Sequence, residues 1–146
     1  MCGIAGLMAD VGSEDCRQIV SRMNAAMVHR GPDDEGLWSE DGFGFGMRRL
    51  SIIDLKGGHQ PMWDKTSRIG IVYNGEIYNY RELRQSWGDK DEEWTTHSDT
   101  EVALKTFIRS GVDAVHAWNG MFAVALWDHI NTLLTWETER RSQIAE

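Results

Sequence analysis

The sequence lacks most features that are typical of membrane proteins, of disulfide-rich secreted proteins and of nucleic-acid-binding proteins. Two cysteines among 146 residues are too few for a disulfide framework. It has no run of about 18 apolar residues, and its start lacks a basic stretch followed by an apolar one, so we expect neither a membrane span nor a signal peptide. Its 15 Lys and Arg against 23 Asp and Glu disfavour non-specific nucleic-acid binding. These features predict a cytoplasmic protein with no nucleic-acid or membrane partner.

Metal ligands in a usable spacing are also lacking. The five histidines and two cysteines form no pattern typical of a structural zinc site, so we expect no metal. The length suits one domain, and a hydrophobic content of 41% is enough to build a core.

The apolar pattern predicts strands, a helix, strands, two helices and strands. The expected strands are 4–8 (buried), 36–39, 44–47, 68–73, 121–127 and 132–136, and the expected helices are about 13–29, 80–87 and 98–109. Ser13 and Ser98 are expected to cap helices, the latter with Glu101 three residues on. Asn74-Gly75 is expected to end strand 68–73, and alone it is typical of a hairpin turn. The order favours an α+β layered sandwich over a parallel βαβ sheet.

Cys2 directly follows the initiator methionine. Once Met1 is removed, Cys2 would carry a thiol and a free α-amine, which are a nucleophile and a candidate base on one residue. An α-amine has a pKa of about 8, so part of it is neutral at pH 7 and accepts a proton. Taken alone, Cys2 also fits a thiol that is merely buried. Cys16 lies in a helical apolar stripe and is expected to be a core residue.

Six short motifs occur in order along the chain. They are MCGIAG (1–6), HRGPDD (29–34), RLSIID (49–54), GHQPM (58–62), VYNGEIYNYRELR (72–84) and SDTE (98–101). Their order and spacing resemble the class II glutamine amidotransferase domain of glutamine-hydrolysing asparagine synthetases, from residue 2 to about Asp128. The resemblance implies an α+β fold of the N-terminal-nucleophile (Ntn) hydrolase type, a four-layer αββα sandwich of antiparallel sheets.

The resemblance implies a catalytic role for three residues. Cys2 would attack the side-chain amide carbon of glutamine, release ammonia and form a γ-glutamyl thioester that water hydrolyses. The side-chain amide of Asn74 and the backbone N–H of Gly75 would form the oxyanion hole, which attack on an amide requires. A histidine base is then unnecessary, and we expect neither His29 nor His59 to act as one.

Free glutamine must also be recognised by its α-carboxylate and α-ammonium. The resemblance assigns the carboxylate to Arg49, because a guanidinium binds both oxygens, although Arg48 competes from sequence alone. Main-chain contacts to the substrate would come from the following residues, Leu50, Ser51, Ile52 and Ile53. Asp99 would pair with the ammonium, with Glu76 nearby. An acid in a first helical turn is also favoured by the helix dipole, so Asp99 fits a structural role as well.

The resemblance weakens after Asp128. The family continues with a segment of the form Arg-Asp-Arg-x-Gly-x-Lys-Pro-Leu and further strands, whereas this chain reads WETERRSQ over 136–143. We therefore expect residues 1–146 to form a glutaminase domain that is incomplete at the C-terminus, without a synthetase domain.

No cofactor is expected in this chain, because it has no nucleotide-binding motif. ATP and Mg would belong to the synthetase domain, in cis or in trans, that uses the ammonia to form asparagine from aspartate. The alternatives are an amidotransferase domain that feeds another acceptor and a non-catalytic remnant that only binds glutamine or a partner chain.

Overall fold

A computed structural model describes residues 2–50, 57–87, 94–130 and 133–140. In chain order its elements are β1 (Gly3–Met8), α1 (Ser13–Ala26), β2 (Asp34–Glu40), β3 (Phe43–Arg49), β4 (Met62–Trp63), β5 (Ile69–Ile77), α2 (Tyr80–Trp87), α3 (Asp99–Ser110), the 3-10 helix η1 (Gly111–Ala117), β6 (Gly120–Asp128) and β7 (Leu133–Arg140). This order confirms the predicted succession of strands and helices.

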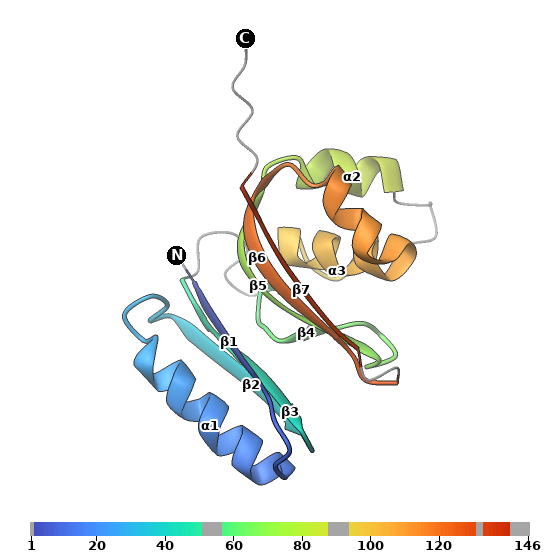
Figure 1. Cartoon of the computed structure of the whole chain (residues 1–146). Coiled ribbons are helices and arrows are strands. Elements are labelled where there is room, and N and C mark those ends of the chain that lie inside the picture. Colours follow the sequence, from blue (N-terminus) through green and yellow to red (C-terminus); the bar gives the residue numbers. More distant parts are fainter. Residues whose placement is uncertain (1, 51–56, 88–93, 131–132, 141–146) are drawn as a thin grey trace.

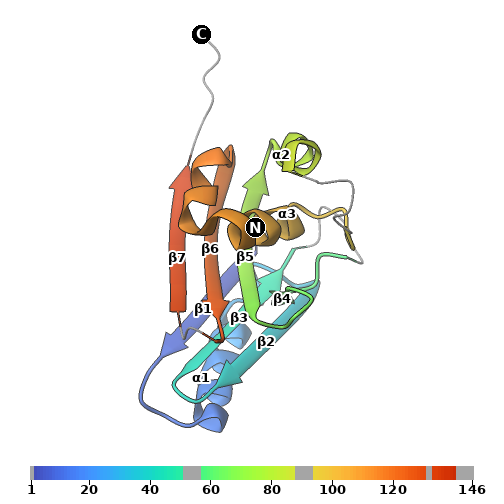
Figure 2. The ribbon, with the colours of Figure 1, turned by 90° about the vertical axis from the view of Figure 1, so that its right-hand side faces the viewer.

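The described strands form two antiparallel sheets. The first has the order β1-β3-β2 and the second β4-β5-β6-β7. Helix α1 covers the outer face of the first sheet, and α2, α3 and η1 cover the outer face of the second (Figure 1). Figure 2 shows the strands of one sheet crossing those of the other. The four layers are therefore α, β, β and α, as predicted.

Apolar side chains gather on both faces of the second sheet. One cluster fills the space between this sheet and its helices, and the other lies between the two sheets. The buried members of the inter-sheet cluster are Phe43, Phe45, Met47, Val72, Ala125 and Trp127. Phe43 and Trp127 come from opposite sheets and stack with ring centroids 4.0 Å apart. Cys2 packs against this cluster and is partly buried, which places it at the border of the inter-sheet core.

The N-terminal elements correct two predictions. Ser13 does not cap α1: the N-cap is Gly12, and the Ser13 backbone N–H donates to Asp41 Oδ1 at 2.8 Å. Strand β1 is not buried throughout, because it lies at the edge of its sheet, and Met8 is 63% exposed. The Ser98 cap is confirmed, since its Oγ accepts from the backbone N–H of Glu101 at 3.3 Å.

Strand β5 corrects a third prediction. Asn74 and Gly75 neither end the strand nor form a hairpin turn. They lie inside β5, paired with Ala123 and Phe122 of β6. Pairing with a strand some fifty residues away thus overrides the local turn preference of an Asn-Gly pair.

Two short elements, β4 and η1, were not expected from the sequence. No helix in the described part of the chain is both long and apolar enough to cross a membrane.

Candidate active site

Cys2 sits just before β1, beside the end of β3. Gly3 pairs with Arg48, so continuing the antiparallel register by one position brings Cys2 opposite Arg49. The backbone N–H of Leu50 donates to the Cys2 Sγ at 3.4 Å, and the Leu50 carbonyl oxygen lies 3.7 Å from the same sulfur. The thiol is therefore in contact with the main chain of one predicted substrate-binding residue and next to another.

Arg30 fixes the backbone of the same cysteine. Its Nε–H donates to the Cys2 carbonyl oxygen at 3.2 Å. Arg30 was not among the predicted site residues, but it lies in HRGPDD, one of the six motifs found in the sequence. A guanidinium that holds the main chain of Cys2 orients the thiol without touching it.

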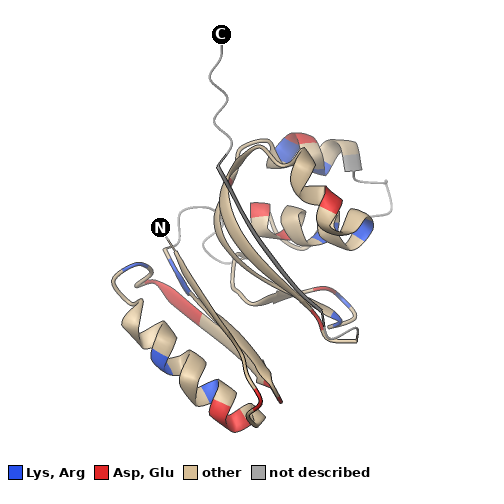
Figure 3. Ribbon diagram, in the orientation of Figure 1, with Lys and Arg blue, Asp and Glu red and all other residues tan. Residues whose placement is uncertain are grey.

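The two neighbouring arginines of β3 have different surroundings. Arg48 forms an ion pair with Glu35 at 3.2 Å and donates from Nε to the Asn24 carbonyl oxygen at 3.3 Å. Arg49 is only 6% exposed, and its guanidinium lies against Gly58. Figure 3 shows the basic end of β3 beside the N-terminus, with the acidic part of β2 across the same sheet. Of the two arginines, the buried Arg49 is the one next to Cys2.

Asn74, Gly75 and Glu76 lie on β5, which packs against both β1 and β3. Side chains alternate along a strand, so Asn74 and Glu76 share the face of Val72, which belongs to the inter-sheet cluster. Gly75 has no side chain, and a Cβ there would overlap the Met121 carbonyl oxygen of β6. The strand thus turns a polar amide toward the sheet that holds Cys2.

Asp99 begins α3 and contacts β5 from the helix side. One carboxylate oxygen, Oδ2, accepts from the Tyr73 hydroxyl at 3.0 Å and from the Ile77 backbone N–H at 3.1 Å. Burial raises the pKa of Asp99, and these two hydrogen bonds oppose that rise. Burial also holds the pKa of Tyr73 well above its ordinary value, reinforced by the charges of Asp99, Glu76 and Cys2. The Tyr73 hydroxyl and the Asp99 carboxylate therefore form a buried hydrogen-bonded pair between β5 and α3.

The structure thus brings the predicted residues to two facing positions. Cys2, Arg49 and Leu50 meet at the end of the first sheet, and Asn74, Gly75 and Glu76 lie on the strand that packs across it. Asp99 contacts the same strand, because its carboxylate accepts a hydrogen bond from the hydroxyl of Tyr73, the residue before Asn74. The predicted residues Ser51, Ile52 and Ile53 lie outside the described residues. His59 is an exposed residue whose Nδ1 pairs with Asp34 Oδ2 at 2.8 Å.

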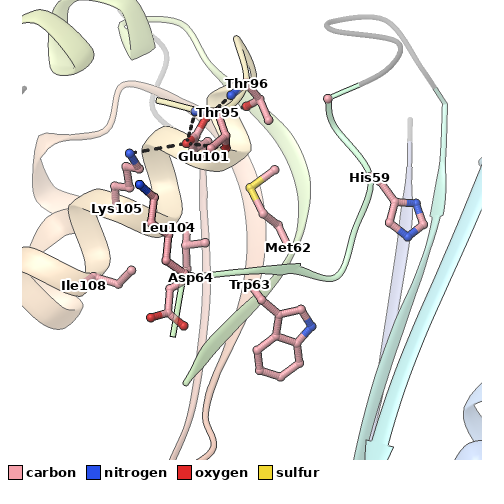
Figure 4. A pocket seen from close by; sticks show the side chains of 12 residues that line it. His59, Met62, Trp63, Asp64, Thr95, Thr96, Glu101, Leu104, Lys105 and Ile108 are labelled. Atoms are coloured by element: carbon pink, nitrogen blue, oxygen red, sulfur yellow. Dashed lines mark hydrogen bonds and ion pairs between the residues drawn. The ribbon is translucent and has the colours of Figure 1, made fainter. Parts of the chain in front are cut away.

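A pocket of about 430 Å³ opens elsewhere, between β4 and α3 (Figure 4). Met62 and Trp63 line one side and Leu104 and Ile108 the other, whereas Cys2, Asn74 and Asp99 are not part of it. The candidate site is therefore defined by the chemistry of Cys2, Asn74 and Asp99 and not by the size of this pocket.

Glu101 lines the same pocket, and its carboxylate is largely enclosed. It accepts from the backbone N–H and hydroxyl groups of Thr95 and Thr96 at 2.7–3.0 Å and lies 3.5 Å from Lys105 Nζ. Burial by itself would raise the pKa of Glu101, but these hydrogen bonds bring it below the ordinary value. Glu101 therefore anchors the segment before α3. Among the described residues, no group of three or more His, Cys, Asp or Glu side chains is placed to hold a metal ion.

Comparison with known proteins gives one family. The glutamine amidotransferase domain family matches residues 1–140. Asparagine synthetase (glutamine-hydrolysing) 1 of Bacillus subtilis is 40% identical over 136 residues, which cover 89% of this chain and 22% of that protein. A putative asparagine synthetase 2 of Methanocaldococcus jannaschii is 40% identical over 159 residues, covering 96% and 30%. The chain thus spans less than a third of the length of these relatives.

The fold also has a counterpart among solved structures. Glutamine phosphoribosylpyrophosphate amidotransferase of Bacillus subtilis superposes with a TM-score of 0.71 at 16% identity, covering 88% of this chain and 35% of that one. At this identity the likeness concerns the fold alone.

Proposed function

Because the chain belongs to the glutamine amidotransferase domain family, as a class II member homologous to glutamine-hydrolysing asparagine synthetases, we propose that it hydrolyses L-glutamine to glutamate and ammonia with Cys2 as nucleophile. The observation that carries this proposal is the contact of the Cys2 Sγ with the Leu50 main chain, directly beside the buried Arg49. A reactive thiol next to an enclosed guanidinium suits a substrate with an amide at one end and a carboxylate at the other.

In this mechanism Met1 is removed, so that the α-amine of Cys2 becomes the base. The amine takes the thiol proton while Sγ attacks the amide carbon of glutamine. Asn74 and Gly75 donate to the developing oxyanion, a contribution of about 3–4 kcal/mol for one donor in other enzymes. The amine then passes its proton to the leaving nitrogen, the carbon–nitrogen bond breaks and ammonia departs. Water cleaves the γ-glutamyl thioester and restores the thiol.

Arg49 and Asp99 bind the two charged groups that distinguish free glutamine from a protein amide. Arg49 takes the α-carboxylate, and the main chain of residues 50–53 adds contacts to it. Asp99 takes the α-ammonium, with Glu76 close by. The near-complete burial of Arg49 and Asp99 supports these roles, since charge pairs are stronger where water is excluded.

We also propose that residues 1–146 form the ammonia-producing domain and that the acceptor is bound by a synthetase domain, in cis or in trans. ATP and Mg act there, where the ammonia serves asparagine formation from aspartate. The homology to asparagine synthetases supports this acceptor over others.

The test is glutamate release by the purified chain, after mass spectrometry has established whether Met1 is gone. Cys2→Ala should abolish release, whereas Cys16→Ala should retain it, because Cys16 is buried in α1. Glutamate release that survives Cys2→Ala would overturn the mechanism. A folded, Met1-free protein that releases none would overturn the proposed function in favour of a domain that only binds.

A further inference from the structure

Tyr73 is a buried residue with a polar end that the mechanism above does not use. Its ring is 3% exposed and belongs to the cluster between the second sheet and the helices. An aromatic ring at this position already fills the core, so packing does not require the hydroxyl. That hydroxyl donates to Asp99 Oδ2 at 3.0 Å.

Tyr73 is also part of a closed ring of hydrogen bonds. Its backbone N–H donates to Gln60 Oε1 at 2.6 Å, and Gln60 Nε2 donates to Thr100 Oγ1 at 3.3 Å. Thr100 follows Asp99 in α3, and the Tyr73 hydroxyl closes the ring. All four residues are buried. A buried network whose members are all satisfied is rigid, so the ring fixes the start of α3 against β5.

The position of Tyr73 on β5 links Asp99 to the rest of the candidate site. Tyr73 faces α3, whereas Asn74, the next residue, faces the sheet that holds Cys2. One strand therefore sets the positions of the proposed oxyanion donor and of the proposed ammonium ligand. Asn74 directly follows Tyr73 in the sequence, and Asp99 accepts a hydrogen bond from the Tyr73 hydroxyl although it lies 26 residues later.

We infer that Tyr73 is a positioning residue for substrate selection: its hydroxyl orients the Asp99 carboxylate and holds it in the charged form that pairs with the α-ammonium of glutamine. This inference rests on the proposed function. Burial favours the neutral form of Asp99, and a hydroxyl donor opposes that effect by stabilising the carboxylate. Without the hydroxyl, Asp99 keeps the Ile77 N–H but loses its side-chain donor.

The experiment compares glutamine with 4-carbamoylbutanoate, which is glutamine without the α-amino group. Tyr73→Phe keeps the ring and removes the hydroxyl. Its KM for glutamine should rise roughly tenfold, as expected for loss of a hydrogen bond to a charged group, with kcat changed less than about twofold. Its kcat/KM for 4-carbamoylbutanoate should not change, because that substrate has no ammonium. Tyr78→Phe, which alters a half-exposed tyrosine, is the matched control and should behave as the parent.

A second variant keeps the inference testable if Tyr73→Phe folds poorly. Asp99→Asn leaves Tyr73 in place and should lose the same preference for glutamine, and adding Tyr73→Phe to it should reduce that preference no further. Equal losses on both substrates would show that Tyr73 is merely structural, and would overturn the inference while leaving the proposed function intact. A folded parent protein that hydrolyses neither substrate would overturn both.

Discussion

The guanidinium of Arg49 and the backbone of Gly58 are packed so closely that a Cβ atom on residue 58 would overlap Arg49 Nη2. Gly58 belongs to the GHQPM segment, and Arg49 ends β3. Glycine here has a role that is not conformational. It leaves the space in which a buried cation is held beside Cys2.

Gly58→Ala is therefore expected to displace the Arg49 side chain rather than unfold the protein, because the obstructed atom is the far end of a flexible side chain. The KM for glutamine should rise about tenfold, with the free energy of unfolding changed by less than about 1 kcal/mol. Steady-state kinetics and urea denaturation measure the two quantities.

Gly6→Ala is the control for this substitution, since a Cβ there makes only ordinary contacts, the nearest at 3.6 Å from the Gly44 carbonyl oxygen. A Gly58→Ala protein with the parental KM would argue against Arg49 as the carboxylate ligand.

Gly75→Ala should act on stability as well as on catalysis. A Cβ on Gly75 would overlap the Met121 carbonyl oxygen and crowd Phe122. Because the nearest of these atoms belong to the backbone of β6, which pairs with β5 here, the two strands would have to move apart. We expect a loss of about 2–3 kcal/mol in the free energy of unfolding, against less than about 0.5 kcal/mol for Gly6→Ala. Equal losses in the two variants would mean that the close approach of β6 does not account for glycine at this position.

Glu101→Gln should destabilise the protein at neutral pH and much less in acid. The pKa of Glu101 is lowered in the folded state, so its carboxylate contributes stability above the pKa of the unfolded chain, and this contribution is lost as the pH falls through the folded value. At pH 7 the free energy of unfolding of the variant should be about 1–3 kcal/mol lower than that of the parent protein. Below pH about 4 this difference in the free energy of unfolding should shrink.

Urea denaturation at several pH values checks this. The control is Glu82→Gln, which changes an exposed residue of α2. If the difference in the free energy of unfolding between the Glu101 variant and the parent stayed constant with pH, the stabilisation by the Thr95 and Thr96 hydrogen bonds would not depend on the charge of Glu101.

The sequence predicted best those structural features that depend on residues close to one another along the chain. Helix α2 was predicted at its observed limits, and the start of α3 follows from Ser98 and Glu101 three residues apart. Asn74-Gly75 shows the opposite case, since its local preference is for a turn and only pairing with β6 keeps it in a strand.

The same contrast between local and long-range contacts applies to the candidate site. Choosing Arg49 over Arg48 requires knowing how β3 is registered with β1 and β2, because adjacent residues of a strand differ in what they face. Asp99 looked like an ordinary first-turn acid, and its partners Tyr73 and Ile77 lie 26 and 22 residues earlier. Contacts of this range leave no local pattern.

The contact between the two sheets has a further consequence. The proposed nucleophile, Cys2, lies at the start of one sheet and the proposed oxyanion donors lie in the other, and the stacked rings of Phe43 and Trp127 lie between the sheets. A slight slip of one sheet over the other would separate Cys2 from Asn74 while every strand kept its own hydrogen bonds. The rate of glutamine cleavage would then report the alignment of two otherwise intact layers, and would fall before any secondary structure melts.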